Sequence, residues 1–316
     1  MTSSPSDNHL TAVEAALARG DAALSPVVAS WSRSAHLHGL DPTRGRRPER
    51  MTEAELAAAR EKMAPLIHAA GPNLDRLFQA VGSVGCCILL ADTDGVPLER
   101  RGASVDDAVF ADWGLWLGTR WSEAAQGTNG IGTCLVEDRV VSIHRDQHFL
   151  SRNTILSCMT APVYDPQGNL AGVLDVSSAR SDLTKGFMTL IVQAVAETAQ
   201  KIEAQAFRDA YPAARMVLVP GSERHPGGLL AVDPDDLVVG ATRAARLHLG
   251  LAGDLASMPR PAADVLGRVA PDRLEDAERS VLARALARAG GNVSAAARNL
   301  GISRATLHRK LGPRLK

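Results

Sequence analysis

Residues 290–316 read GGNVSAAARNLGISRATLHRKLGPRLK, and this order of signals is the one that a helix-turn-helix requires. Asn292 can cap a first helix through Leu300, Gly301 suits a left-handed helix stop, and Ser303 can cap a second helix. The pattern therefore predicts two short helices joined by a tight turn. The apolar residues expected to hold these helices together are Ala296, Leu300, Ile302 and Leu307.

The same stretch concentrates positive charge. It carries six basic residues and no acidic one, whereas the whole chain is formally neutral, with 35 basic and 35 acidic residues. A local excess of this kind suits a surface that binds double-stranded DNA. The alternative is a terminal hairpin with a solvated basic face, but the caps, the turn glycine and the charge together favour DNA. The residues expected at the DNA surface are Ser303, Arg304, Thr306, His308, Arg309, Lys310 and Arg314.

The segment AAARNLGISRATLHRKL resembles the DNA-binding end of Fis-type regulators, and the resemblance begins at RLEDAERSVLARALARAGGN, residues 273–292. It implies an all-α DNA-binding domain over residues 271–316, in which the preceding helix pairs with its copy. We therefore expect a homodimer on a palindromic operator, with help from a long helix over residues 185–207. The apolar residues at helical spacing in the pairing helix are Leu274, Ala277, Val281, Leu282, Ala285 and Leu286.

Composition sets the remaining limits. A length of 316 residues accommodates two or three domains. The first residues show no basic-then-apolar signal pattern, and no apolar run approaches the length of a membrane span, so we expect a cytoplasmic protein without membrane contact. RNA polymerase is a further candidate partner of a chain with this DNA-binding end.

The first 72 residues are predicted to be a helical region. One helix should begin at the cap Ser25 and end at Gly39. Another should begin with a capping box made by Thr52 and Glu55 and stop at Gly71, which precedes a proline.

Residues 73–207 are predicted to contain both strands and helices. Apolar runs and turn signals predict strands at 85–92, 96–102, 139–144, 158–165 and 170–178, with a tryptophan-containing loop between the second and third. A long amphipathic helix should follow over 185–207. The expected fold class is α+β, a central antiparallel sheet with flanking helices.

The motifs of this region resemble the sensor half of acetoin-catabolism-type regulators. They are WSEAAQGTNGIGTCL, CMTAPVYDPQGNLAGVLDVSS and, upstream, SWSRSAHLHGLDP. The resemblance implies a GAF sensor domain over residues 73–207. It also implies a short PAS-like segment and linker over 208–270, where residues 227–251 should form strand, turn, strand and helix.

One feature departs from that family. Its members usually carry a central AAA+ ATPase, but this sequence has no GxxxxGK[ST] phosphate loop, and only about 65 residues separate the sensor helix from the DNA-binding end. We therefore expect regulation without ATPase activity, and no enzyme activity or catalytic residue.

The stretch GTNGIGT is the predicted sensor site. Its glycines let backbone amides approach a ligand at a helix N-terminus, although a tight turn that only packs the helix on the sheet explains them equally well. The neighbouring aromatic surface and the scarcity of charge favour a small, largely uncharged metabolite over an acidic one. The residues expected to bind it are Trp116, Trp121, Thr128, Asn129, His148 and Phe149.

Cysteines leave two further hypotheses open. The chain has four, in apolar contexts without the spacing of a disulfide scaffold. One alternative is a redox sensor that uses Cys134 and Cys158, or a haem sensor that uses His144 or His148. A less favoured one is a GAF-type methionine sulfoxide reductase with pocket cysteines, including Cys86. Neither a cofactor nor a bound metal is predicted, because these residues lack compact ligand spacing.

Overall fold

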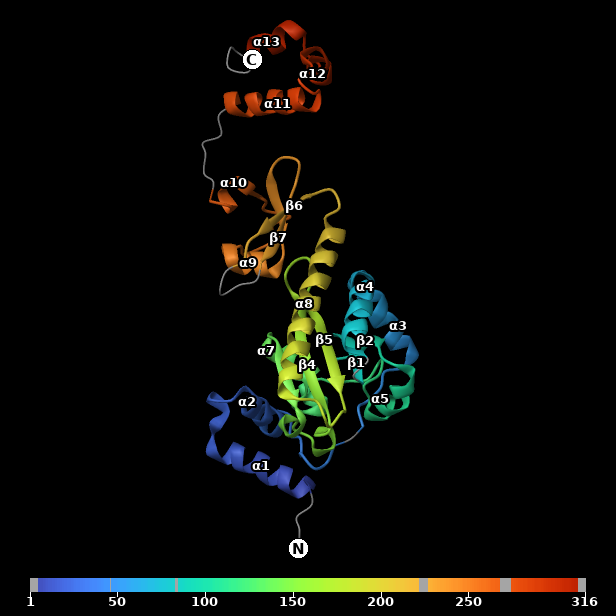
Figure 1. Ribbon diagram of the computed structural model, residues 1–316. Coiled ribbons are helices and arrows are strands. Elements are labelled where there is room, and N and C mark those ends of the chain that lie inside the picture. The colour runs from blue at the N-terminus through green and yellow to red at the C-terminus, as the bar shows by residue number, and fades with distance from the viewer. Residues whose placement is uncertain (1–4, 46, 83–84, 222–226, 268–273, 312–316) are drawn as a thin grey trace. The chain divides into compact units, whose positions relative to one another are not determined.

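The computed structural model describes residues 5–45, 47–82, 85–221, 227–267 and 274–311 (Figure 1). The chain divides into two compact units, one ending at Pro261 and the other beginning at Ala262. No helix of the described ranges has both the length and the hydropathy that a bilayer crossing needs.

The N-terminal helices are α1 (Pro5–Arg19) and α2 (Pro26–Ser32), joined by η1 (Asp21–Ala23) and followed by a π-helical turn, η2 (Arg33–Leu37). The Ser25 hydroxyl accepts a hydrogen bond from the Val28 amide at 3.4 Å, which confirms the predicted cap. Side chains from these helices pack around the sensor residues Phe149 and Leu150. The helical region is thus docked on the sensor domain.

Helix α3 (Glu53–Lys62) begins with the predicted capping box of Thr52 and Glu55, but the predicted stop after it is wrong. Helix α4 (Ala64–Val81) runs through Gly71 and Pro72 and across the expected domain boundary. An interior proline costs about 3 kcal/mol. Burial offsets that cost, because each buried leucine contributes about 1.5–3 kcal/mol. The buried leucines of α4 are Leu66, Leu74 and Leu77.

A five-stranded antiparallel sheet forms the centre of the sensor domain, in the order β2-β1-β5-β4-β3. This confirms the α+β fold class. The pairing of β1 with β5 runs without interruption from Cys86↔Ser178 to Asp92↔Gly172. The strands are β1 (Cys86–Asp92), β2 (Pro97–Arg101), β3 (Val141–His144), β4 (Ser157–Tyr164) and β5 (Leu170–Ser178).

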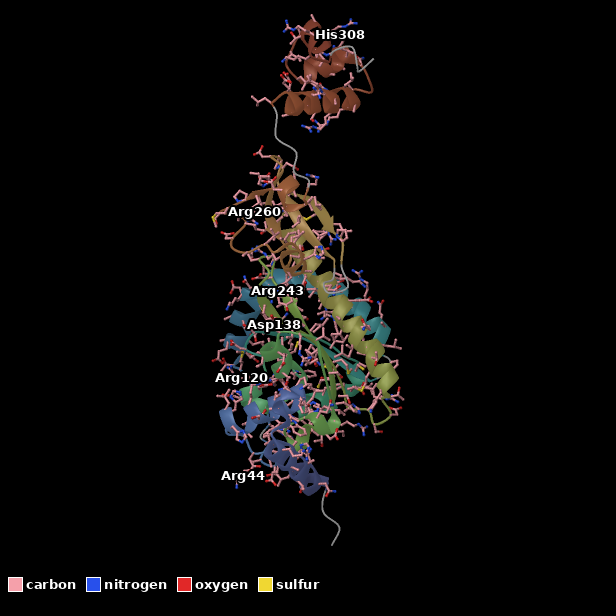
Figure 2. The ribbon with its side chains drawn as sticks, turned by 90° about the vertical axis from the view of Figure 1, so that its left-hand side faces the viewer. Arg44, Arg120, Asp138, Arg243, Arg260 and His308 are labelled. Atoms are coloured by element: carbon pink, nitrogen blue, oxygen red, sulfur yellow. The ribbon has the colours of Figure 1, made fainter. Side chains whose placement is uncertain are left out.

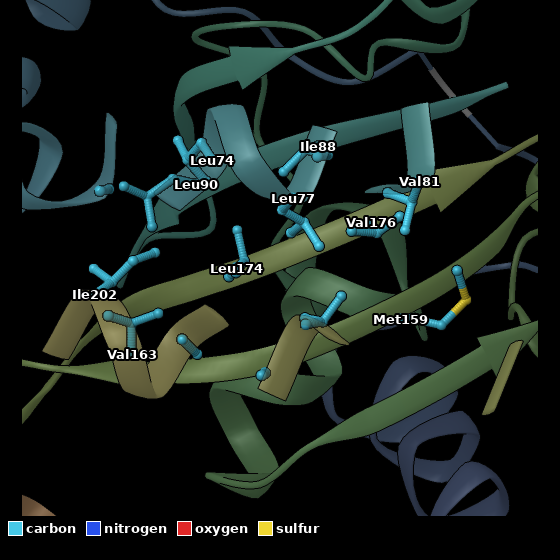
Figure 3. Close-up of a cluster of buried hydrophobic side chains, with 14 of the residues drawn as sticks. Leu74, Leu77, Val81, Ile88, Leu90, Met159, Val163, Leu174, Val176 and Ile202 are labelled. Atoms are coloured by element: carbon cyan, nitrogen blue, oxygen red, sulfur yellow. The ribbon is translucent and has the colours of Figure 1, made fainter. Parts of the chain in front are cut away.

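Two cores lie on opposite faces of this sheet. Helices α4 and α8 (Lys185–Ala210) cover one face over the larger core, which Figure 3 shows in part. Three shorter helices lie on the side of the second core: α5 (Asp107–Trp113), α6 (Glu123–Gln126) and α7 (Gly130–Glu137). Helix α5 occupies part of the segment that was expected to be a loop. The turns η4 (Ser104–Asp106), η5 (Arg145–Gln147) and η6 (Ser151–Asn153) complete the domain.

A second, four-stranded sheet follows α8, in the order β6-β7-β8-β9. Its centre confirms the expected strand, turn, strand and helix, with β7 (Gly228–Val232), β8 (Leu237–Ala241) and α9 (Arg243–Leu249). Strands β6 (Arg215–Val219) and β9 (Arg260–Pro261) are additions that the sequence did not predict. Both are edge strands, and β9 is too short to give a pattern.

The second unit contains α10 (Ala262–Val265), α11 (Leu274–Arg288), α12 (Val293–Asn299) and α13 (Arg304–Leu311). The predicted turn signals are confirmed. Asn292 accepts a hydrogen bond from the Ala295 amide at 3.0 Å, Ser303 accepts one from the Thr306 amide at 3.0 Å, and Gly301 has a φ of +65°. The predicted contacts form the core, in which Ala296 and Leu307 are fully buried.

Candidate functional site

The helix-turn-helix presents a basic surface on α13. Arg304, His308, Arg309 and Lys310 are exposed, as expected, and Figure 2 labels His308. Ser303 is exposed too, and Thr306 is half-buried, with its hydroxyl 2.8 Å from that of Ser303. Arg314, the remaining residue predicted to contact DNA, lies outside the described residues.

One of these cations already has a partner. The Lys310 ammonium pairs with the carboxylate of Glu278 on α11. Both side chains are partly exposed, so the pair contributes little to stability. A phosphate that binds Lys310 would compete with Glu278.

The apolar stripe of α11 divides into two parts. Leu282 and Ala285 are buried against α12 and α13, and Leu286 packs beside them. Leu274, at the start of the helix, is 91% exposed, and Val281, in the middle, is 42% exposed. Part of the stripe is therefore buried in the core of the unit, and Leu274 and Val281 remain as exposed apolar side chains.

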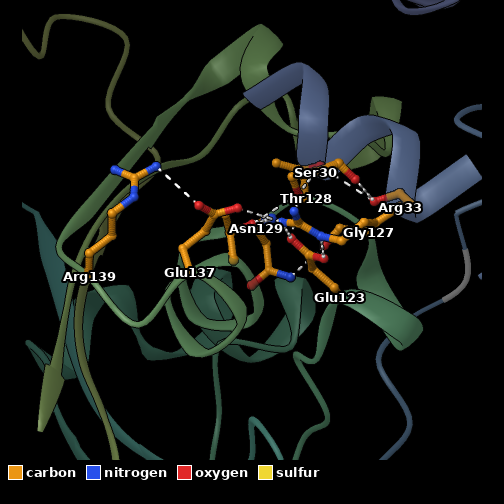
Figure 4. A network of polar contacts seen from close by, with 10 residues as sticks. Ser30, Arg33, Glu123, Gly127, Thr128, Asn129, Glu137 and Arg139 are labelled. Atoms are coloured by element: carbon orange, nitrogen blue, oxygen red, sulfur yellow. Dashed lines mark hydrogen bonds and ion pairs between the residues drawn. The ribbon is translucent and has the colours of Figure 1, made fainter. Parts of the chain in front are cut away.

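The sensor domain contains a buried polar network under the N-terminal helices (Figure 4). The Glu123 carboxylate accepts two hydrogen bonds from the Arg33 guanidinium, at 2.8 and 2.9 Å, and one from the Ser30 hydroxyl at 2.5 Å. Ser30 is also 2.7 Å from the hydroxyl of Thr128. The side chain of Glu123 is only 1% exposed, and its hydrogen bond is the main cause of a raised Arg33 pKa. The network joins two segments that are about 90 residues apart in the sequence.

The glycine-rich turn packs α7 directly on the sheet. Asn129 accepts a hydrogen bond from the Gly132 amide at 2.9 Å, and its amide group donates to the carbonyls of Trp121 and Gly127. A Cβ on Gly130 would lie 2.5 Å from Cys158, and one on Gly132 would lie 2.4 Å from the Glu123 backbone nitrogen. These close approaches require glycine, so the turn has a structural role whatever it binds.

The two predicted tryptophans differ in their surroundings. Trp121 is 1% exposed in the second core, and its indole N–H donates to the Gly114 carbonyl at 2.7 Å. Trp116 is half-buried, with the Arg100 guanidinium 4.2 Å from its ring centre. Phe149 is fully buried, and it packs against the N-terminal helices.

His148 belongs to a chain of buried polar groups on β4 and β5. Its Nδ1 donates to the Arg145 carbonyl at 3.0 Å, and its Nε2 is 3.4 Å from the Cys158 sulfur. Burial lowers the pKa of His148 to about 4, so the ring is neutral. Ser177 continues the chain, because its hydroxyl is 3.2 Å from Cys158 and donates to Asp175 at 2.6 Å. Burial raises the pKa of Asp175 to about 6.

Sequence reasoning gave no role to Thr160 and Ser177. Thr160 donates to Asp175 at 2.5 Å, and both hydroxyl residues are fully buried. The available signal was their place in β4 and β5, where polar residues interrupt otherwise apolar strands. These polar groups satisfy one another inside the domain, and such a satisfied network makes the core more rigid.

Comparisons with known proteins place the chain in a family. The family model of the MimR N-terminal domain matches residues 7–201, and the model described as "Bacterial regulatory protein, Fis family" matches residues 273–312. The first match covers more than half of the chain. The chain belongs to the MimR N-terminal domain family. The resemblance to acetoin-catabolism-type regulators with a Fis-type end is thereby confirmed.

Two relatives extend this family relation. The chain is 32% identical over 277 residues to the acetoin catabolism regulatory protein of Cupriavidus necator, a match of 83% of this chain and 41% of the relative. It is 29% identical over 223 residues to the propane 2-monooxygenase operon transcriptional activator MimR of Mycolicibacterium smegmatis, covering 68% and 36%. The chain thus spans less than half of the length of these two relatives.

A solved structure supports the fold. The crystal structure of the Escherichia coli DhaR(N)-DhaL complex matches with a TM-score of 0.53 and 16% identity, covering 72% of this chain and 77% of that one. The MimR family match begins within α1 and ends within α8, so the Ser30–Glu123 network lies inside the family domain and the second sheet lies outside it.

The four cysteines of this family member are all free and buried. Burial raises the pKa of Cys86 to about 11 and that of Cys87 to about 12, and it raises those of Cys134 and Cys158 as well. Reactive cysteines need the opposite shift. Within the described ranges, no three His, Cys, Asp or Glu side chains are grouped so that they could hold a metal ion.

Proposed function

We propose that this chain is a ligand-responsive transcriptional regulator that binds a palindromic operator as a homodimer and works without ATPase activity. The observation that carries the proposal is the capped helix-turn-helix, whose exposed surface is basic while its core is complete. The names of the relatives, which refer to operon activation and acetoin catabolism, support a regulatory role. Contact with RNA polymerase is the route to activation in this proposal.

Helix α13 should enter the major groove, with Arg304, Thr306 and Arg309 nearest the bases and Lys310 and Arg314 nearest phosphate. Arg309→Ala should cost roughly 1–3 kcal/mol on the operator if it contacts a guanine through two hydrogen bonds. Lys310→Ala should weaken binding to all DNA about equally. Fluorescence anisotropy with operator and random duplexes tests this. If both variants lose only non-specific affinity, α13 does not read bases.

The homodimer should form through the exposed apolar side chains of α11. Leu274 and Val281 are the appropriate probes, because Leu286 packs within the unit. Leu274→Asp with Val281→Asp should give monomers with poor operator affinity, whereas half-sites of the wild-type operator should lie about 34 Å apart. Sedimentation that shows an intact dimer for the double variant would place the interface elsewhere, for example on α8.

The effector should be a small organic metabolite bound between the glycine-rich turn and the tryptophan segment. Trp116 and Trp121 would supply apolar walls, Phe149 a further one, and Thr128, Asn129 and His148 the orienting hydrogen bonds. In the described conformation these polar side chains already have protein partners. Binding would therefore exchange internal hydrogen bonds for bonds to the ligand.

Tryptophan fluorescence during titration with small alcohols, ketones and aldehydes tests effector binding. Trp121→Ala and Asn129→Ala should abolish the effect of the ligand on operator affinity while leaving ligand-free DNA binding intact. Trp113→Phe, at the edge of the same core, is the matched control. A tenfold change in operator affinity requires about 1.4 kcal/mol of coupling between the two sites. An unchanged response in the Trp121 variant would place the sensing site elsewhere, and the redox hypothesis would then gain support.

A further inference from the structure

A cavity lies away from the proposed effector site, between α8 and the second sheet. Its volume is about 350 Å³, within the range of small-molecule sites. Helix α8 and strand β4 line one side, and β7 and α9 line the other. Residues of the sensor domain and of the PAS-like segment thus share one cavity within the first compact unit.

The lining is apolar and incompletely covered. Val140, Leu218 and Leu247 all contribute to it, and they remain 37%, 71% and 53% exposed. Each is among the large apolar side chains that the fold leaves exposed. Their convergence on one cavity indicates a surface that an apolar ligand would shield from water.

Two polar groups in the lining have unused hydrogen-bonding capacity. The carboxyl group of Glu203 on α8 accepts one long hydrogen bond, 3.3 Å from the Tyr164 amide. The guanidinium of Arg243 pairs through Nη2 with Asp138 at 2.9 Å, but its Nε is buried and has no hydrogen-bond partner. Figure 2 labels Asp138 and Arg243 close together. One cavity therefore offers an acceptor and a buried donor.

Three other polar side chains of the lining have protein partners. The Arg208 guanidinium donates to the Ala204 carbonyl at 3.3 Å. The Tyr164 hydroxyl donates to Asp138 at 2.7 Å, and the Thr242 hydroxyl accepts from the Leu229 amide at 3.0 Å. Burial raises the pKa of Glu203 to about 8, against the opposing effects of the Tyr164 amide and of Arg243. Arg243 and Glu203 both line this one cavity.

We propose that this cavity binds a small alcohol, whose hydroxyl donates to Glu203 and accepts from the Nε–H of Arg243 while its hydrocarbon part covers Leu218 and Leu247. A hydroxyl is the smallest group that both donates and accepts. An ammonium group has no acceptor for Arg243. A carboxylate could pair only with the protonated form of Glu203, whereas a hydroxyl can pair with Glu203 in either protonation state. The site is separate from the proposed effector site and does not depend on it.

Titration of the full-length chain with 1-butanol tests the proposal, followed by the methyl NMR signals of Leu229 and Leu247. 1-Butanol should shift these signals in a saturable way and bind at least tenfold more tightly than butylamine or butyrate. Glu203→Ala should weaken binding at least tenfold. Glu197→Ala, on the same helix in a surface pair with Lys201, should leave it unchanged. The proposal would be overturned if Glu203→Ala and Glu197→Ala bound 1-butanol equally well. It would also be overturned if the wild-type chain bound butyrate more tightly than 1-butanol.

Two further variants keep the test decisive. Arg243→Lys removes the Nε–H but retains a charge for Asp138, so it should weaken 1-butanol binding without unfolding the chain. Ala196→Phe fills the cavity from α8 and should have the same effect if Glu203→Ala fails to fold. If Trp121→Ala rather than these variants abolishes the Leu229 and Leu247 shifts, the alcohol binds at the proposed effector site and this inference is wrong.

Discussion

Helices α12 and α7 both begin at an asparagine N-cap, but the two asparagines lie in different surroundings. Asn292 satisfies one backbone amide and remains exposed to solvent. Asn129 is 1% exposed, and its side chain also holds two carbonyl groups. In the helix-turn-helix, the side chains left over after folding are available for DNA. In the sensor domain, the candidate polar side chains already serve the fold, so a ligand has to replace existing bonds.

The largest effect is expected from a substitution that disrupts the buried polar network of the sensor domain. Glu123→Ala should destabilise the sensor domain by about 3 kcal/mol, because it removes the shared acceptor of the buried Ser30 hydroxyl and of the partly exposed Arg33 guanidinium. Chemical denaturation measures the loss. Glu137→Ala is the control, since Glu137 accepts a single bond from the same arginine and is more exposed. Equal losses in the two variants would show that burial of Glu123 does not distinguish it.

The next effect is a pH dependence of stability that the exposed DNA surface should lack. The raised pKa of Asp175 means that the folded state prefers the protonated acid. Its stabilising contribution is therefore complete below about pH 4 and is lost as the pH rises through about 6, on the order of 2–3 kcal/mol. Asp175→Asn should remove this component from the urea unfolding free energy measured between pH 4 and 7. A variant with the wild-type slope would mean that Asp175 titrates normally.

The two asparagine caps can be compared directly. Asn292→Ala should cost about 1 kcal/mol, as a solvent-exposed cap does. Asn129→Ala should cost about 2 kcal/mol or more, because the variant also leaves buried carbonyl groups without a donor. Thermal unfolding of the second unit and of the sensor domain, followed separately by NMR, gives the two values. A smaller loss at Asn129 would contradict the view that the glycine-rich turn is mainly structural.

The smallest effect concerns the pair of Lys310 and Glu278. Glu278→Ala should change stability by less than about 1 kcal/mol, as expected for an exposed pair. It should also raise affinity for random DNA modestly, by less than tenfold, because Lys310 is freed and a negative charge is lost. Anisotropy titrations at two salt concentrations measure this. Weaker binding would mean that Glu278 positions Lys310 for phosphate.

The helix-turn-helix could be predicted from the sequence because its signals are local. The capping residues and the turn glycine lie within a few residues of the helices that they define. Asn292, Gly301 and Ser303 all have the expected roles. The strands of the first sheet were equally accessible from apolar runs. The continuation of α4 through Pro72 was not, because burial of leucines by distant elements outweighs a local signal.

The sensor interior could be predicted only in part. The sequence analysis named His148, Trp121 and Asn129 as candidates. The structure shows that all three are buried, and no local pattern predicted their partners. The contact of Ser30 with Glu123 spans 93 residues, and no local pattern encodes it. Thr160 was missed for the same reason, since only the register of β4 with β5 brings it to Asp175. Ser177 lies two residues from Asp175 on the same face of β5, and this local pattern was available in the sequence.

Helix α8 has a mechanical consequence. It is one continuous helix of 26 residues, roughly 39 Å long at 1.5 Å per residue. Its first turns pack on the sensor sheet, and Glu203, in its later turns, lines the cavity between α8 and the second sheet. A rod of this kind transmits axial shifts and rotations with little loss. We therefore expect a ligand in this cavity and a ligand at the proposed effector site, on the opposite face of the sensor sheet, to change each other's affinity by equal and reciprocal factors.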